Sequence, residues 1–542
     1  MASPAHCWQA AGTLPTLLRI VSCIALTRST VRPFLPGSRA RGVAGGSRSM
    51  PDPLKILFMA SEMAPFARTG TLSEMTYALP RALRALGHDV RVAIPRYGRI
   101  DPVKFGLRPL ISGLPIPIDD HSEPVDVLTT ELDGGLPVYL IDNQKYFGRE
   151  NLYGYPDDGE RFIFYSRSTM EMLKALNWKP DILHLNDWHT AIVANWLKTI
   201  YKEDPFFHNV ASVYTIHNLA YQGIFGSRIL EIAGVEEYSA MYPPMDEFPN
   251  VVALMAHGIL FADTISTVSE SYAREILTPE YGEKLHTLLN DRKDRVFGIL
   301  NGVDYEAMNP ATDPYLPQNY DADRLHLRSL NKPAFQREVN LPVDEDVPLI
   351  GCISRLTSQK GFDILGEVID ALLELPLQMV IMGTGDQYYH EMLGRLARRH
   401  PTKLALFLTY NTALAQRIYG ASDCFLMPSR FEPCGGNQMI AMRYGSVPIV
   451  RSTGALADTV QDFDPRTGTG NGFTFQKYSG MMLFAAVVRA METYKYKDVW
   501  RRLMEAGMRA DHSWSAAARR YVELYQKTLE AKGGAQAPIP VG

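Results

Sequence analysis

Cysteine is scarce in this chain, with five residues among 542. The cysteines show none of the close spacings by which cysteine pairs hold zinc, and three of them lie in or beside apolar runs, as buried thiols do. So few cysteines in so long a chain also argue against a disulfide framework. The five are Cys7, Cys23, Cys352, Cys424 and Cys434. The sequence therefore predicts a reducing compartment, and the expected location is the cytoplasm.

Positive charge is not in excess either. The chain has 55 Lys and Arg against 59 Asp and Glu, which gives a formal net charge of −4. A nucleic-acid-binding protein usually carries a basic face or a high pI, so nucleic acid is not an expected partner. The most apolar early stretch, residues 14–26, is short and is interrupted by Pro15 and Arg19. A membrane-spanning helix needs about 20 apolar residues, so no membrane partner is expected.

Acidic residues are missing from the first 49 positions, which contain several Arg and Ser. Such a leader is typical of an organellar transit peptide, which would place the protein in a plastid. The other interpretation, which we favour slightly, is an extension upstream of a true start at Met50. Neither interpretation makes residues 1–49 part of a folded domain, so we expect them to be disordered or absent from the mature protein.

The signature motifs of three enzyme classes are also absent. No GxxxxGK[ST] run occurs, so a P-loop nucleotide hydrolase has no support. No HExxH pair with a third ligand occurs, which argues against catalytic zinc. No GxSxG turn occurs, which argues against a serine hydrolase of the α/β type. The sequence therefore predicts neither a catalytic metal nor a cofactor.

Apolar runs alternate with helical patterns along the remaining chain. Residues 54–59 are apolar except for Lys55, as in a buried parallel strand. Apolar side chains then recur at helical spacing from Leu72 to Leu83, before a second strand at residues 90–94. Further strands are expected at residues 138–141, 182–185, 212–216, 264–267, 296–300, 349–353, 379–382, 404–408, 424–427 and 447–450. Further helices are expected at residues 161–176, 362–375, 388–399, 437–444 and 516–532.

This alternation predicts an α/β protein with two doubly wound domains that face each other across a cleft. A stretch rich in Pro, Asn and Asp separates the two series of strands and is expected to be the inter-domain linker and a hinge. After the leader, the expected boundaries are 50–304 for the first domain, 305–347 for the linker, 348–510 for the second domain, and 511–542 for a C-terminal helix and tail.

Three charged residues stand in loops that follow predicted strands. Glu432 lies between a strand at residues 424–427 and a helix at residues 437–444. Open α/β sheets bind ligands at the carboxyl ends of their strands, and helix N-termini attract phosphate. Arg355 and Lys360 flank a similar loop, where two fixed cations suit a diphosphate. The alternatives are a helix-capping or surface carboxylate and two solvated surface cations.

Two histidines end apolar strands in the first half of the chain. His189 stands two residues after Asp187, and His217 follows the next predicted strand. A histidine near a carboxylate can serve as a general base, a metal ligand or an orienting hydrogen-bond donor. For each histidine taken alone, the better interpretation is a core side chain with its ring bonded to the backbone.

Six longer stretches stand in order along the chain: ILHLNDWHTA, YTIHNLAYQG, GILNGVD, SRLTSQKGFD, PSRFEPCGGNQMIAMRYGSVPIVRSTGALADTV and HSWSAAARRYVELY. Together they resemble the bacterial glycogen synthase and plant starch synthase family, and the likeness runs from about Lys55 to Tyr525. The resemblance implies the GT-B fold, in which two Rossmann-like domains hold the active site between them. It also implies metal-independent, retaining transfer of glucose from ADP-glucose to the 4-OH at the non-reducing end of an α-1,4-glucan, either glycogen or starch.

The same resemblance implies roles for four catalytic residues. Arg355 and Lys360 match the pair that holds the nucleotide diphosphate and its growing negative charge. Glu432 matches the carboxylate that contacts the hydroxyls of the donor glucose, and His189 matches the histidine near the reacting carbon. The substrate-binding residues implied in this way are Arg68, Gly70, Asp157, His217, Asn301, Tyr410, Cys434, Gly435, Thr453 and Gly454.

The sequence departs from the family's pattern in the loop that closes on the donor phosphates. Arg68 replaces a lysine, Thr71 a glycine and Glu74 an aspartate, and Ala455 replaces a glycine in the second domain. A Cβ at Thr71 is expected to penalise a positive φ or to block close approach of the backbone to phosphate. Two rival hypotheses therefore stay open. One is a weakly active glucan-binding or regulatory paralogue, and the other is a GT-B transferase with another nucleotide-sugar donor.

Overall fold

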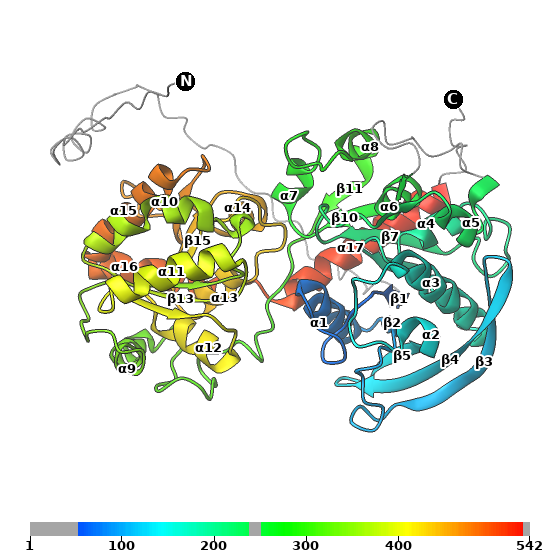
Figure 1. Ribbon diagram of the computed structural model, residues 1–542, viewed down its shortest axis with the longest axis horizontal. Helices are drawn as coiled ribbons and strands as arrows, with labels where there is room; N and C mark the ends of the chain where they lie inside the picture. The colour runs from blue at the N-terminus through cyan, green and yellow to red at the C-terminus, as the bar shows by residue number, and fades with distance from the viewer. Residues whose placement is uncertain (1–52, 238–250, 535–542) are drawn as a thin grey trace, which may run out of the picture. The chain divides into compact units, whose positions relative to one another are not determined.

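Nine strands form the first of two large sheets in the computed structural model, which describes residues 53–237 and 251–534. Their order is β11-β10-β7-β6-β1-β2-β5-β4-β3, in which β4 pairs antiparallel with β3 and β5 and all other neighbours pair in parallel (Figure 1). The strands are β1 (Lys55–Met59), β2 (Asp89–Pro95), β3 (Arg108–Ile118), β4 (His121–Leu132), β5 (Leu136–Asp142), β6 (Ile182–Asn186), β7 (Ala211–Ile216), β10 (Thr264–Thr267) and β11 (Val296–Gly298). A separate sheet of two short antiparallel strands pairs β8 (Ile224–Gly226) with β9 (Val251–Ala253).

Helices that belong with this sheet alternate with its strands. They are α1 (Thr71–Ala85), α2 (Gln144–Phe147), α3 (Asp158–Ala175), α4 (Ile192–Trp196), α5 (Ile229–Ile232), α6 (Leu254–Phe261), α7 (Glu270–Glu275), α8 (His286–Asp291) and the 3-10 turn η3 (Lys293–Arg295). In α1, Leu72, Met75, Leu79 and Leu83 are all buried, as their helical spacing predicts.

Six parallel strands form the second sheet, in the order β14-β13-β12-β15-β16-β17. Numbered within the sheet, this is the 3-2-1-4-5-6 order of dinucleotide-binding folds. The strands are β12 (Leu349–Ile353), β13 (Gln378–Met382), β14 (Leu404–Phe407), β15 (Cys424–Met427), β16 (Val447–Arg451) and β17 (Phe473–Phe475). The helices are η4 (Leu325–Leu330), α9 (Asn331–Glu338), η5 (Ser358–Lys360), α10 (Phe362–Glu374), α11 (Gln387–Arg399), α12 (Thr412–Ala421), α13 (Asn437–Arg443), α14 (Gly454–Thr459), α15 (Gly480–Tyr494) and α16 (Lys497–Arg509).

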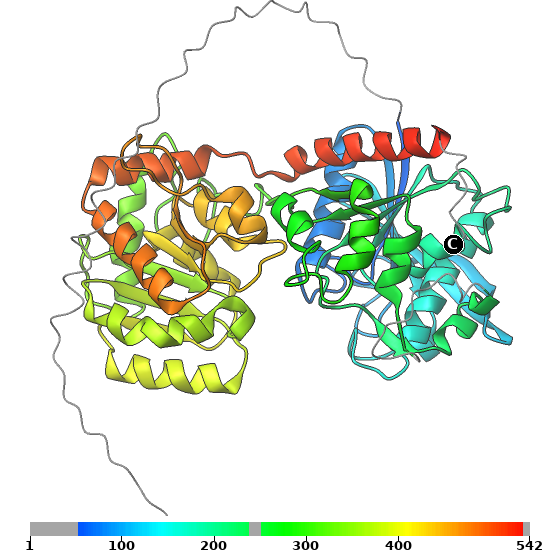
Figure 2. The same ribbon diagram turned by 90° about the horizontal axis from the view of Figure 1, so that it is seen from above.

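The last helix, α17 (Trp514–Gly534), returns to the first sheet. It packs against α1 and β7, and Figure 2 shows it lying along this part of the fold. Tyr521 and Tyr525 are fully buried on its inner face. The Tyr525 hydroxyl lies 2.7 Å from Nδ1 of His184 in β6, whose Nε2 lies 2.6 Å from the Thr215 hydroxyl in β7. The C-terminal helix is therefore part of the core of the first sheet.

Several elements of the structure were not predicted from the sequence, among them β17, α12, α15 and α16. The β3–β4 hairpin was not predicted, because most β3 side chains are exposed and Pro109, Pro115 and Pro117 interrupt the strand pattern.

The expected linker is not simply extended, because η4 and α9 form within it and pack on the second sheet, where Phe335 is buried. The chain crosses between the sheets twice, and Val303 N donates to His512 O at 2.7 Å where the crossings meet. The domain boundaries themselves stay predictions.

Both sheets place a change of winding direction at their centre. The chain winds outward from β1 to β2 on one side and from β6 to β7 on the other, and β12 and β15 mark the same point in the second sheet. Open α/β sheets bind ligands at the carboxyl ends of such strands. The loops after β1, β6, β12 and β15 are therefore where a site should form.

Three other expectations concerned a membrane-spanning helix, a metal site and residues 1–49. Within residues 53–237 and 251–534, no helix is both long and apolar enough to cross a bilayer. The same residues hold no group of three or more His, Cys, Asp or Glu placed to bind a metal ion. The expectation for residues 1–49 lies outside the described part of the chain.

Candidate functional site

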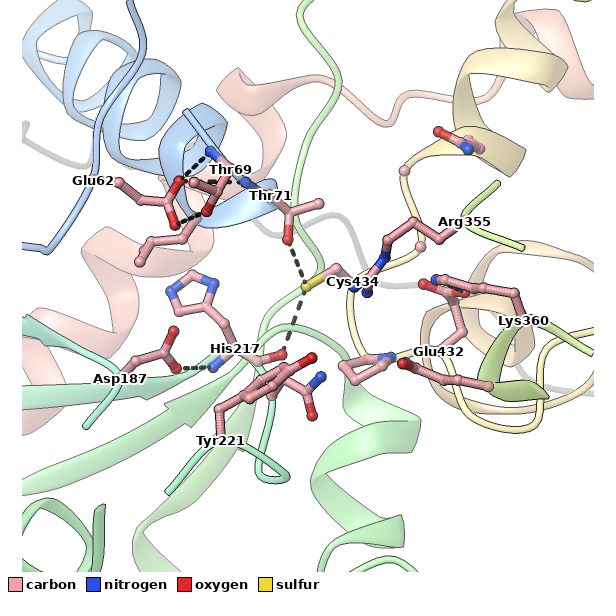
Figure 3. A pocket seen from close by; sticks show the side chains of 18 of the residues that line it. Glu62, Thr69, Thr71, Asp187, His217, Tyr221, Arg355, Lys360, Glu432 and Cys434 are labelled. Atoms are coloured by element: carbon pink, nitrogen blue, oxygen red, sulfur yellow. Dashed lines mark hydrogen bonds and ion pairs between the residues drawn. The ribbon is translucent and has the colours of Figure 1, made fainter. Parts of the chain in front are cut away.

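A cavity of about 590 Å³ opens among the strand-end loops of both sheets (Figure 3). The first sheet contributes the loops after β1, β6 and β7, and the second contributes the loops after β12 and β15. Of the fourteen residues predicted for the site, eight line this cavity. They are Gly70, His189, His217, Arg355, Lys360, Glu432, Cys434 and Gly435.

Glu62 organises the wall of the cavity that follows β1. Glu62 is 4% exposed, and its carboxylate accepts hydrogen bonds from Thr69 N at 2.6 Å, Gly70 N at 3.3 Å and the Tyr153 hydroxyl at 3.0 Å. These bonds hold the loop that leads into α1 against the end of β1. Neither Glu62 nor Tyr153 was predicted. The only sequence signal for Glu62 is its position. It is a carboxylate three residues beyond the end of a predicted buried strand, β1.

Asp187 and His217 form the floor between β6 and β7. The backbone of Asp187 has a φ of +55°, and its Oδ1 accepts a hydrogen bond from His217 N at 2.8 Å. Burial raises the pKa of Asp187 to about 7. Burial also lowers the pKa of His217 to about 3, and its Nε2 lies 3.0 Å from Asn186 Oδ1. His217 is therefore neutral at pH 7 and is bonded to a side chain.

His189 lies in an aromatic setting beside this floor. Its ring stacks on Trp188 with the centroids 4.0 Å apart and meets the edge of Phe162 at 4.5 Å. Burial, followed by the nearby Arg161 guanidinium, lowers the pKa of His189 to about 3. Its Nδ1 has no hydrogen-bond partner among the described residues. The interpretation of a histidine bonded to backbone therefore does not hold here, and the neutral ring can form a hydrogen bond with a ligand in the cavity.

Lys360 and Glu432 meet on the opposite wall. Lys360 Nζ lies 2.6 Å from Glu432 Oε2, which also accepts from the Ser429 hydroxyl at 2.9 Å. Gly361 permits this approach: its φ is +82°, and a Cβ there would lie 2.1 Å from Pro428 O. Glu432 is thus a buried, paired carboxylate, so the alternative of a surface carboxylate is wrong.

Arg355 differs from Lys360 in its pairing. Its side chain is exposed and lines the cavity. Within the part of the chain that the structure describes, its guanidinium forms no hydrogen bond or ion pair. A guanidinium presents a planar fork of donors that matches phosphate oxygens. Arg355 is therefore free to receive an anionic group that enters the cavity.

Cys434 links the second sheet's loops to the first. The Thr71 hydroxyl donates to Cys434 Sγ at 3.5 Å, and Sγ lies 3.8 Å from His217 O. Burial raises the pKa of Cys434 to about 12, so the thiol is neutral. Thr71 is the first residue of α1 and is not among the residues with positive φ, and Gly70 before it is extended. The predicted backbone strain at Thr71 is therefore wrong, while hindered approach to phosphate stays a prediction.

Replacing Thr71 with glycine should raise kcat/KM for the donor by at most about tenfold, since one lengthened hydrogen bond is the remaining penalty. The same change should lower the free energy of unfolding by about 1 kcal/mol, because glycine weakens the first turn of α1. Steady-state kinetics and urea unfolding measure the two effects. Thr71→Val, which keeps the Cβ and removes only the hydroxyl, is the control and should show no gain. Equal kcat/KM in all three proteins would contradict the remaining hypothesis.

Six predicted residues do not line this cavity. Arg68 is an exposed side chain paired with Glu74, and Tyr410, which the resemblance places against the base, is 67% exposed. Asp157 is held by Arg149 at 2.6 Å. The others are Asn301, Thr453 and Gly454, of which Asn301 is buried and the last two bond Glu275. The roles of these six residues stay predictions.

Two family models match the chain. Residues 55–291 match the starch synthase catalytic domain, and residues 335–503 match glycosyl transferases group 1. A glycogen synthase of Moorella thermoacetica is 46% identical over 493 residues, covering 90% of this chain and 100% of that protein. A glycogen synthase of Thermotoga maritima is 42% identical over 486 residues, covering 89% of this chain and 100% of that protein.

Solved structures give the same picture. The catalytic domain of Starch Synthase IV from Arabidopsis thaliana, bound to ADP and acarbose, matches with a TM-score of 0.81 and 35% identity, covering 88% of this chain and 100% of that one. Sucrose-phosphate synthase from Thermosynechococcus elongatus matches with a TM-score of 0.54 and 15% identity, covering 88% and 99%. At that identity the second likeness concerns the fold alone.

Proposed function

The chain belongs to the glycogen synthase and starch synthase family of glycosyltransferases, and we propose that it transfers glucose from ADP-glucose to the non-reducing 4-OH of an α-1,4-glucan. The GT-B fold expected from the sequence is confirmed by the likeness to solved structures. One observation supports the specific reaction most directly. Arg355, Lys360 and Glu432, which follow strands of the second sheet, line the same cavity as His189, which follows a strand of the first.

The two cations suit the departing diphosphate. Charge develops on the leaving ADP as the bond between the anomeric carbon of glucose and the diphosphate oxygen breaks, and preorganised cations at such a group are usually the largest catalytic contribution. Arg355 is unpaired within the described residues and offers a fork of donors. Lys360 adds a point charge that Glu432 already holds in place at 2.6 Å. Together they give the diphosphate two positively charged partners in the cavity.

The carboxylates of the cavity are all engaged with protein groups. Glu432 Oε2 is held by Lys360 and Ser429, and Glu62 is held by the loop before α1. Asp187 accepts from His217 N. None of the three is a free nucleophile, which favours attack by the acceptor hydroxyl on the face from which ADP leaves. His189, neutral at pH 7, is suited to orient a sugar hydroxyl by a hydrogen bond.

We also propose a cytoplasmic location. The described cysteines, Cys352, Cys424 and Cys434, are free and buried, which fits a reducing compartment. The plastid alternative depends on residues 1–49, which lie outside the described part of the chain.

A donor panel tests the proposal. Purified full-length protein is incubated with glycogen and with ADP-glucose, UDP-glucose or GDP-glucose, and release of the nucleoside diphosphate is followed. The highest kcat/KM is expected with ADP-glucose. A higher value with UDP-glucose would reject the donor assignment in favour of the second rival hypothesis. Absence of transfer from every donor, with glycogen still bound in a sedimentation assay, would support the regulatory paralogue instead.

A further inference from the structure

Two short helices, one beside each large sheet, bond to each other reciprocally. Glu275, the last residue of α7, accepts hydrogen bonds from the Thr453 hydroxyl and Gly454 N at 2.9 Å each. Asp458 of α14 accepts in return from Ser271 N at 3.1 Å and from the Ser271 hydroxyl at 2.6 Å. Each helix thus supplies the carboxylate that binds the first turn of the other. We call this pair of contacts the α7–α14 clasp.

Only one half of the clasp touches the loop that carries Glu432. Ala455 N, next to Gly454, donates to Glu432 O at 3.0 Å. Gly454 has a φ of +47°, and a Cβ there would lie 2.1 Å from Glu432 O. The segment bonded to Glu275 therefore lies directly against the backbone of Glu432, with no space between them.

The side chain of Glu432 depends on that backbone position. Its Oε2 receives both Lys360 at 2.6 Å and Ser429 at 2.9 Å, so a small shift of the loop would disturb both bonds. Glu275 itself does not line the cavity, and its Oε2 is buried without a hydrogen-bond partner among the described residues. Glu275 can therefore affect the cavity only through Thr453 and Gly454, the residues to which it is hydrogen-bonded.

We propose that Glu275 is a positioning residue, which fixes the segment of Thr453 and Gly454 and through it the catalytic carboxylate Glu432. Glu275, which fixes the position of Glu432, lies in α7 beside the first sheet. Glu432 lies in the loop after β15 of the second sheet. The site is therefore assembled correctly only when α7 meets α14. The kinetic part of this inference rests on the proposed glycosyltransfer, and the structural part does not.

Glu275→Ala tests the inference against a matched control. The variant should lower kcat about tenfold or more with KM for ADP-glucose changed less than about threefold, because misplacement of a catalytic group mainly affects turnover. Asp458→Ala breaks the other half of the clasp, which does not touch Glu432, and kcat should stay within about twofold of wild type. Glu275→Gln keeps an oxygen that accepts both hydrogen bonds and should restore most of the lost kcat.

Equal loss of kcat in Glu275→Ala and Asp458→Ala would overturn the proposal, since both would then act only by weakening the clasp. If Glu275→Ala does not fold, Glu275→Asp replaces it, because the shorter side chain withdraws the carboxylate from Thr453 and Gly454, and it should lower kcat in the same way. A crystal structure of the variant provides a readout that needs no turnover. The segment of Thr453 to Ala455 should move away from Glu432, and an unmoved segment would overturn the proposal even if the wild-type protein transferred no glucose.

Discussion

Replacing Arg355 with alanine is expected to lower kcat for glucose transfer by about 10²- to 10³-fold, as when one preorganised contact to developing charge is removed elsewhere. Stability should hardly change, because the guanidinium is exposed and forms no ion pair within the described residues. The substitution thus removes a charge that makes no stabilising interaction with the described residues of the folded protein. The kinetic loss can then be assigned to the reaction rather than to unfolding.

Steady-state rates of ADP release and the midpoint of urea unfolding measure the two quantities. Arg395→Ala is the matched control, because Arg395 is an exposed arginine on α11 that does not line the cavity. Arg355→Lys keeps the charge but not the fork of donors, so it should recover only part of the lost activity. Near-wild-type turnover of Arg355→Ala would remove Arg355 from the list of catalytic residues.

Buried parallel strands were the most predictable part of the fold. β12 (Leu349–Ile353) and β15 (Cys424–Met427) begin and end where the sequence places them. Such strands are covered on both faces and therefore appear as short, continuous apolar runs. The β3–β4 hairpin carries no such run, because one of its faces meets water and prolines interrupt its pattern. Its existence depends on pairing with β5, which local sequence does not encode.

The candidate site was predictable to the extent that it lies at strand ends. Lys360 and His189 follow strands β12 and β6, and the topology brings those ends to one cavity. Glu62, which lines the cavity, and Glu275, which does not, were both missed, because each is bonded to backbone N–H groups and neither belongs to a recognised motif. Gly454 N–H bonds Glu275 in the structure, and its predicted role as a substrate contact stays a prediction. The contact of Glu275 with Gly454 joins residues far apart in sequence, so spacing alone does not reveal it.

The pair of Lys360 and Glu432 should separate stability from catalysis. The side chains are 17% and 7% exposed, and their charged atoms lie 2.6 Å apart. Removing one partner of a largely buried pair leaves the other charge uncompensated, which lowers stability by about 3–5 kcal/mol. Lys360→Met should therefore unfold at lower urea concentration and also lose about 10²-fold or more in kcat, because it removes a charge that stabilises the departing diphosphate.

The double variant Lys360→Met/Glu432→Gln leaves no uncompensated charge, so its free energy of unfolding should recover most of the loss. Its kcat should nevertheless stay at least about 10²-fold below that of wild type, because neither the cation nor the carboxylate is restored. Urea unfolding and ADP release on the four proteins of the cycle give both quantities. Recovery of kcat together with stability would show that the single variant lost activity through its fold, and that the pair has no part in the chemistry. If the double variant recovers stability but not kcat, the pair takes part in the reaction, because its low turnover then cannot be caused by loss of folding.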